Sequence, residues 1–192
     1  MILLDPGHGS NTKGKRSPVW PDGSQLFEWE FNRDVCRRIQ SRLARMNIDS
    51  QIIVKEAIDV PLKIRADRAN AVYLKDPSSF LISVHANAGG GQGWEIWTSP
   101  DETESDKIAT IIYTTAQAML PQFRMRHDYS DGDPDKESRF YMLTKTKCPA
   151  VLSENLFYDN MVECRFLMSD YGREIIAKIH SIAIQSYLRI RQ

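Results

Sequence analysis

Long apolar runs are absent from this sequence of 192 residues, and so is any excess of charge of one sign. No stretch approaches the roughly 20 apolar residues that a membrane helix requires, which argues against a membrane-spanning protein. Lysine and arginine together number 25, as do aspartate and glutamate, so the chain has no basic field for nucleic acid or anionic lipid. We therefore expect neither nucleic acid nor membrane as a partner.

Cysteine is scarce and irregularly spaced. The sequence contains three cysteines, Cys36, Cys148 and Cys164, and no two of them have C-x-x-C spacing. An odd number without the spacing of a zinc ribbon predicts buried free thiols rather than a disulfide framework. An export signal is not visible either, because the chain opens directly on an apolar strand. We expect a protein that is made without a signal, or one from which the signal has been removed.

Segments with strand and helix periodicity alternate along the chain, which predicts an α/β fold. The expected fold is a twisted, mostly parallel sheet of about six strands flanked by helices on both faces, in one domain over residues 1–192. The expected strands cover 2–4, 48–54, 79–85, 94–98, 140–144 and 150–154. The expected helices cover 27–46, 60–74, 102–120, 161–168 and 171–190. A polar segment, 121–139, is predicted to be a loop or lid.

Polar residues follow three of these strands where each ends. His8 lies in the turn Asp5-Pro6-Gly7-His8-Gly9 after the first strand, His85 ends the third, and Glu154 ends the last. Each alone is as readily a hydrogen-bonded residue at a strand end as a metal ligand or a general base. The carboxyl ends of parallel strands meet at one edge of a sheet, so the three side chains are predicted to share a cleft.

The first helix contributes a fourth candidate, and helix geometry separates its two acids. At about 100° per residue, Glu28 lies in line with the apolar stripe that includes Phe31 and Val35. Glu30 lies on nearly the opposite side with Arg33 and should be solvated. A carboxylate on the buried stripe is costly unless it is paired or bound to a cation. We therefore predict Glu28 as the site residue.

Two imidazoles and one carboxylate form a His2Glu set, a common ligand group for catalytic zinc. Such a site leaves a coordination position open, and a second carboxylate outside the metal shell can act as general base. Glu154 suits that second role. The set as a whole predicts metal-assisted amide hydrolysis.

At these residues the chain resembles the zinc-dependent N-acetylmuramoyl-L-alanine amidases, the Amidase_3 family of bacterial and phage cell-wall hydrolases. The resemblance extends over most of the chain, and its motifs come in the family's order. The matching blocks are Asp5-Pro6-Gly7-His8-Gly9; Glu28 with Asn32; Arg65 with Arg68-Ala69-Asn70; Ser83-Val84-His85-Ala86-Asn87-Ala88; Gly93 with Glu95; and Pro149-Ala150-Val151-Leu152-Ser153-Glu154 with Phe157 and Asn160.

The resemblance implies a single catalytic amidase domain that binds one Zn²⁺ through His8, Glu28 and His85. Glu154 would be the catalytic glutamate, moving the proton while the amide between N-acetylmuramic acid and L-alanine is hydrolysed. Peptidoglycan would be the partner, bound by a monomer. Asn87 lies next to the metal residues and is a candidate for substrate binding, although turn formation explains it equally well.

One departure from the family pattern and several alternatives bear on the function. Leu156 stands where the family has a small residue, and we expect it either to narrow the cleft or to alter the preference for the stem peptide. The enzyme would act on the cell wall, in the periplasm or outside the cell, either as a phage or prophage endolysin released by a holin or as a secreted enzyme. A non-catalytic wall-binding protein with the same fold and a zinc peptidase acting within the peptide stem are the other two classes.

Overall fold

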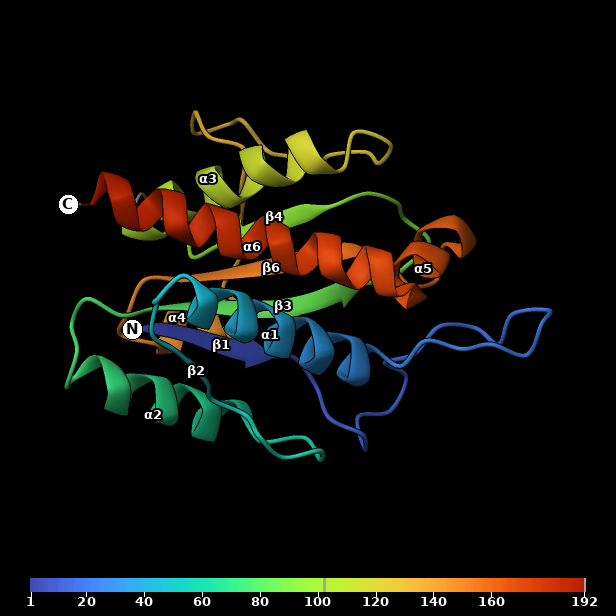
Figure 1. Cartoon of the computed structure of the whole chain (residues 1–192), viewed down its shortest axis with the longest axis horizontal. Helices are drawn as coiled ribbons and strands as arrows, with labels where there is room; N and C mark the ends of the chain where they lie inside the picture. Colours follow the sequence, from blue (N-terminus) through green and yellow to red (C-terminus); the bar gives the residue numbers. More distant parts are fainter. Residues whose placement is uncertain (102, 192) are drawn as a thin grey trace.

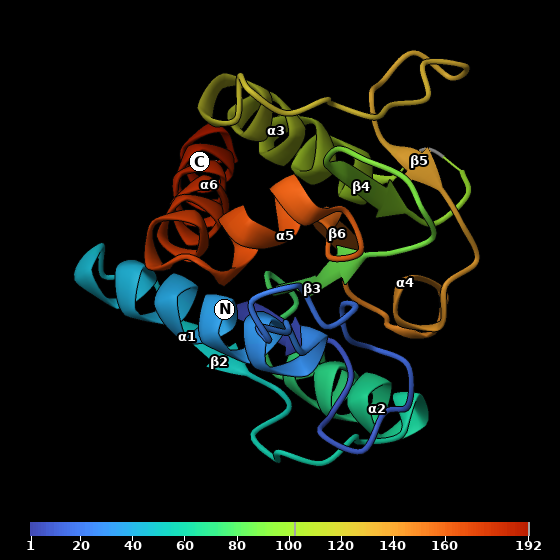
Figure 2. The same ribbon diagram turned by 90° about the vertical axis from the view of Figure 1, so that its right-hand side faces the viewer.

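The protein is an α/β sandwich in which one sheet lies between two layers of helices (Figures 1 and 2). The structure, a computed structural model, describes residues 1–101 and 103–191. The strands are β1 (Ile2–Pro6), β2 (Ser50–Ile52), β3 (Phe80–Asn87), β4 (Glu95–Thr98), β5 (Lys136–Glu137) and β6 (Ala150–Phe157). The helices are α1 (Glu28–Arg45), α2 (Leu62–Tyr73), α3 (Glu104–Met119), α4 (Tyr141–Lys145), α5 (Met161–Met168) and α6 (Asp170–Ile190).

The six strands form one sheet in the order β2-β1-β3-β6-β4-β5. The neighbouring strands β2, β1, β3 and β6 are mutually parallel. The strand β4 runs antiparallel to β6, and β5 pairs parallel with β4. The predicted class, a mostly parallel sheet of about six strands flanked by helices, is confirmed. Because β1, β3 and β6 are neighbours and parallel, their carboxyl ends open on the same edge.

Alternate residues of the central strands face two separate cores. On β3, Ile82 packs into a core with the helices α1, α3 and α6, whereas Leu81 packs on the opposite face against α2 and α4. Figure 2 shows α1, α3, α5 and α6 on one side of the sheet and α2 and α4 on the other. Coverage on both faces explains why β3 and β6 consist largely of apolar residues.

The predicted elements agree with the structure except in the segment between α3 and β6. Residues 140–144 were expected as a strand but form the short helix α4. The adjacent residues Met142 and Leu143 are both buried in the same core. A helical turn allows this, whereas a strand would point them to opposite faces. The two-residue strand β5 lies in the segment expected to be loop. Glu102, the expected first residue of the third helix, and Gln192 lie outside the described residues.

The predicted state of the cysteines is confirmed, since Cys36, Cys148 and Cys164 are all free and buried. Within the described residues, the helices are too short or too polar to cross a membrane. The expectation of a single catalytic domain over 1–192 remains a prediction.

Candidate active site

His8 is held at the end of β1 by an unusual backbone. Its φ of 62° lies in the left-handed region that residues other than glycine seldom adopt. Gly7 lies directly against the ring of His85, and a Cβ at this position would be 2.1 Å from His85 Cε1. The Gly7 N–H donates to the carbonyl of Val84, which joins the turn to β3. The glycine therefore allows the two histidine rings to approach each other.

A buried arginine fixes this turn through hydrogen bonds. Arg65 of α2, with 1% of its surface exposed, donates to the carboxylates of Asp5 and Asp59, each at 2.8 Å. It also donates to the carbonyls of Pro6 at 2.8 Å and His8 at 3.1 Å. The guanidinium presents several donors in a rigid plane, so one side chain fixes the backbone on both sides of Gly7.

Glu28, the first residue of α1, extends between the two histidines. Its Oε1 lies 3.4 Å from His8 Nε2 and 3.1 Å from His85 Nδ1, and it accepts the N–H of Ala86 at 3.2 Å. Figure 1 shows α1 beginning at the edge to which the arrowheads of β1 and β3 point. Glu28 is buried and Glu30 is exposed, as the helix-face argument predicts. Arg33, expected in solvent beside Glu30, is instead buried and donates to the carbonyls of His8 and Glu56.

The second oxygen of Glu28 bears on whether a metal fits. Glu28 Oε2 is buried and has no hydrogen-bond partner among the described residues, and the nearest cation is Lys15 Nζ at 3.9 Å. One ligand atom each from His8, Glu28 and His85 lie within 4.8 Å of one another. A buried carboxylate with an unused oxygen, facing two imidazoles, is the donor set of a zinc site. These three residues therefore fit a zinc ion.

The charges of the site are strongly coupled. Burial opposes the ionisation of Glu28, but its contacts with His8 and His85 outweigh this and lower the pKa of its carboxyl. Burial likewise opposes the charging of His85, while Glu28 and then Glu154 raise the pKa of its imidazole. The pair Glu28 and His85 thus attracts positive charge, either a proton or a metal ion.

Glu154 lies on β6 directly opposite His85 on β3 in the parallel register. Burial, assisted by the charge of Glu28, raises the pKa of Glu154 to about 7. Its Oε2 is buried and has no hydrogen-bond partner among the described residues. A carboxyl group that titrates near neutral pH beside a metal-binding set is suited to taking up and releasing a proton.

A cavity of about 430 Å³ opens beside these groups. His8, His85 and Glu154 are among its polar lining residues, whereas Glu28 does not line it. Leu62 of α2 and Met142 of α4 belong to an apolar wall of the same cavity. The short helix α4 that was not expected thus contributes to the site. A polar reaction centre facing an apolar wall is the usual arrangement of an enzyme pocket.

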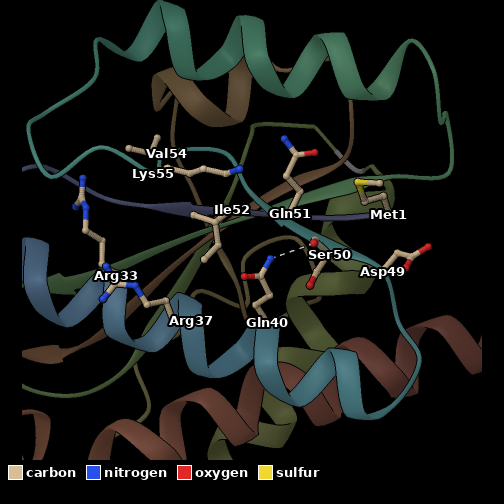
Figure 3. A pocket seen from close by; sticks show the side chains of 10 residues that line it. All are labelled: Met1, Arg33, Arg37, Gln40, Asp49, Ser50, Gln51, Ile52, Val54 and Lys55. Carbon is tan, nitrogen blue, oxygen red and sulfur yellow. Dashed lines mark hydrogen bonds between the residues drawn. The ribbon is translucent and has the colours of Figure 1, made fainter.

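A larger cavity, of about 770 Å³, lies between α1 and β2 at the edge of the sheet (Figure 3). None of the ten residues that line it is a histidine or a cysteine. Gln40 reaches across from α1 and donates its Nε2 to the carbonyl of Ser50 at 3.1 Å. Because its lining has no metal-binding set, we assign the reaction centre to the smaller cavity.

The side-chain amide of Asn87, the candidate for substrate binding, makes its hydrogen bonds within the protein. Its Nδ2 donates to Glu95 Oε1 at 2.7 Å, and its Oδ1 accepts the N–H of Ala88 at 2.8 Å. Asn87 is not among the residues that line the smaller cavity. Glu95 in turn accepts from Arg126 and Lys136. These contacts favour a structural role in the loop after β3 over direct substrate contact.

Leu156 does not narrow the cleft, contrary to expectation. Its side chain is fully buried in the core formed by the long helices, and it is not among the residues that line the cavity. Its φ of 65° lies in the left-handed region, where a glycine would be unstrained. The small residue expected by resemblance therefore reflects a backbone requirement of β6 rather than space for substrate.

Sequence reasoning missed a buried polar chain behind the site. Asn155 donates its Nδ2 to the carbonyl of His85 at 2.8 Å and accepts the Trp94 indole N–H at 2.8 Å. It also donates to Ser153 Oγ at 3.2 Å, which lies 2.9 Å from Nε2 of the buried His180 on α6. Burial lowers the pKa of His180 to about 4, so this histidine is neutral. Asn155 directly follows Glu154, but that position alone gives no sign of the contact with His85.

Comparisons with known proteins identify the family of the chain. A sequence model of the family described as N-acetylmuramoyl-L-alanine amidase matches residues 2–186. The sporulation-specific N-acetylmuramoyl-L-alanine amidase of Bacillus subtilis (strain 168) is 24% identical over 191 residues, covering 100% of this chain and 69% of the relative. The endolysin of Bacillus phage SPP1 is 26% identical over 194 residues, covering 100% of this chain and 67% of the relative. The chain spans about two thirds of the length of both relatives.

Solved structures share the fold. An N-acetylmuramoyl-L-alanine amidase from Clostridium difficile 630 matches with a TM-score of 0.85 at 24% identity, covering 100% of this chain and 97% of that chain. The catalytic domain of CwlV, an N-acetylmuramoyl-L-alanine amidase from Bacillus (Paenibacillus) polymyxa var. colistinus, matches with a TM-score of 0.78 at 20% identity, covering 98% of each chain.

Proposed function

The chain belongs to the N-acetylmuramoyl-L-alanine amidase family, and from this premise we propose that it is a zinc-dependent enzyme that cuts peptidoglycan. The bond cleaved is the amide between N-acetylmuramic acid and the L-alanine of the peptide stem. One observation carries the proposal: His8, Glu28 and His85 form a metal-binding set, and its two histidines line the same cavity as Glu154.

His8, Glu28 and His85 would hold the zinc ion. When bound, zinc acts as a Lewis acid, polarising the amide carbonyl and making water more acidic. The unused Oε2 of Glu28 and the imidazoles that surround its Oε1 support this ligand set. Two asparagines fix the backbone of these ligands. Asn32 donates to the carbonyl of Gly7 at 3.1 Å, and Asn155 donates to the carbonyl of His85 at 2.8 Å.

Glu154 carries the proton in this proposal. As a carboxylate it accepts a proton from the water that attacks the amide carbonyl, and as an acid it returns that proton to the leaving nitrogen of L-alanine. Without zinc, burial raises the pKa of Glu154 to about 7, and a bound zinc ion would lower it from this value, which keeps the carboxylate available as the base near neutral pH. Leu62 and Met142 supply apolar surface on the wall of the same cavity.

Digestion of purified sacculi by the zinc-loaded enzyme, followed by mass spectrometry of the products, tests the reaction. Free amino-terminal L-alanine on released stems is the expected result. New ends within the stem would identify a zinc peptidase, and the absence of any product would identify a wall-binding protein; either result would overturn the proposal.

Two variants test the assigned roles. Glu154→Gln should retain one zinc ion per chain and lose turnover, because it keeps the shape of the side chain but cannot exchange a proton. His85→Ala should lose both zinc and turnover. A Glu154→Gln enzyme with normal turnover would show that Glu154 is not the base.

We also propose that the protein acts as a monomer on the cell wall, in the periplasm or outside the cell. Its relatives include a phage endolysin and a sporulation amidase. Release of the protein across a bacterial membrane only when a holin is co-expressed would favour the endolysin role. Release without a holin would favour a secreted enzyme.

A further inference from the structure

A second group of acids lies near the edge of the sheet formed by β4 and β5, away from the zinc-binding residues. Asp106 is in the first turn of α3, while Asp133 and Asp135 are in the loop that leads into β5. One carboxylate oxygen from each of the three lies within 4.8 Å of the others. Figure 2 shows this loop passing from α3 to β5, beside β4.

One of these acids is buried with an unused oxygen. Asp135 is 1% exposed, and its Oδ2 accepts the hydroxyl of Thr98 at 2.5 Å. Its Oδ1 is buried and has no hydrogen-bond partner within the described residues. No cationic side chain of the described part of the chain forms an ion pair with Asp106, Asp133 or Asp135. A buried carboxylate without a counter-charge is costly, and burial accordingly raises the pKa of Asp135 to about 8, so either a proton or a cation must neutralise it.

We propose that Asp106, Asp133 and Asp135 bind a calcium ion. Three atoms no more than 4.8 Å apart all lie within about 2.8 Å of a common point, close to the 2.3–2.6 Å of calcium–oxygen bonds. The ligands are oxygens only, with no histidine or thiolate among them, which suits a hard cation rather than zinc. A loop that supplies carboxylates at alternate positions adapts to the irregular coordination of calcium more easily than to the strict octahedron of magnesium.

The bound ion would join three segments that are distant in sequence. It would connect the start of α3 to the loop before β5, and Thr98 would connect it to β4 through Asp135. The strand β5 is only two residues long, and its Lys136 donates to Glu95 Oε2 at 2.9 Å. Calcium would therefore stabilise the edge of the sheet without taking part in the reaction.

The expected effect is a rise in thermal stability with calcium. Sites of this kind in extracellular modules bind calcium with a Kd of about 0.1–1 mM. At about 10 mM calcium, that affinity predicts a rise in Tm of roughly 3–10 °C for a chain of this size.

Differential scanning fluorimetry of the zinc-loaded enzyme, in buffers freed of calcium and then titrated with it, tests the proposal. Asp133→Asn and Asp135→Asn should abolish the rise in Tm, whereas Asp128→Asn should retain it. Asp128 is the matched control, because it is an exposed acid of the same loop. A wild-type like Tm of Asp133→Asn without calcium would show that the variant is folded.

Three outcomes would overturn the proposal. The Tm of the wild-type enzyme would not change with calcium, or it would rise equally in Asp133→Asn and Asp135→Asn. An equal rise with magnesium would overturn the assignment to calcium.

Discussion

The substitution Glu154→Gln should stabilise the zinc-free protein while it removes activity. The carboxyl of Glu154 has its pKa raised from 4.5 to about 7, mainly by burial. An acid whose pKa is higher in the folded state than in the unfolded state destabilises the fold as it ionises. Its stability contribution is complete below about pH 4.5 and is lost as the pH rises toward 7. Glutamine has no ionisable proton, so the variant avoids the cost of a buried charge.

The size of the effect follows from the two pKa values. A tenfold change in an ionisation constant is worth about 1.4 kcal/mol, so the full difference is of the order of 3 kcal/mol. Less than about 1 kcal/mol of this destabilisation is present at pH 5, and nearly all of it is present at pH 8. The free energy of unfolding of Glu154→Gln, relative to the wild type, should therefore increase by roughly 2 kcal/mol between these two pH values.

Urea unfolding of both zinc-free proteins at pH 5 and pH 8 measures this difference. Groups remote from Glu154, including Asp135 with its pKa raised to about 8 by burial, cancel between the two proteins. The pKa of His85 falls in the variant, because Glu154 helps to raise it, so the measured difference also includes the titration of His85. Glu30→Gln is the matched control, because Glu30 is exposed and should show no such trend. A difference between Glu154→Gln and the wild type that is the same at both pH values would refute the reasoning.

Three further predictions concern the residues around the site. Glu28→Gln should lose zinc and turnover whereas Glu30→Gln retains both, as zinc content and sacculus digestion will show; the reverse would contradict the orientation of α1. Arg65→Met should destabilise the protein to urea by about 3–5 kcal/mol by leaving Asp5 buried without its partner, and adding Asp5→Asn should recover part of the loss. An Arg65→Met protein of normal stability would contradict the role given to that ion pair. Leu156→Gly should still destabilise, by roughly 2–4 kcal/mol, because the relief of about 1 kcal/mol of backbone strain is smaller than the loss of a buried leucine. A gain in the urea midpoint would show that strain dominates.

The sequence predicted the parts of the fold and site that depend on regular periodicity. The stripe on the first helix was regular enough to separate Glu28 from Glu30, and the three strand ends brought His8, His85 and Glu154 to one edge. Both inferences require only repeating backbone geometry and parallel pairing. The structure agrees with them at the level of position and burial, while the chemical roles await the experiments above.

The remaining features depend on contacts that no local pattern encodes. Arg33 lies next to the solvated face of its helix but finds carbonyl partners in two distant loops, so it is buried. The segment 140–144 has strand-like composition, yet packing against the core turns it into a helix that lines the cavity. Leu156 fills a core position while its backbone adopts a conformation typical of glycine, and a sequence pattern cannot separate these two demands.

The pairing of His85 with Glu154 across β3 and β6 has a consequence for how the enzyme fails. The two strands lie in the middle of the sheet and are held by neighbours on both sides. If β6 slid by a single residue against β3, Glu154 would point into the opposite layer and away from the histidines. Partial loss of catalysis through gradual loosening of this pair is therefore not expected: a molecule either has its strands aligned and can react, or has lost that alignment and is inert.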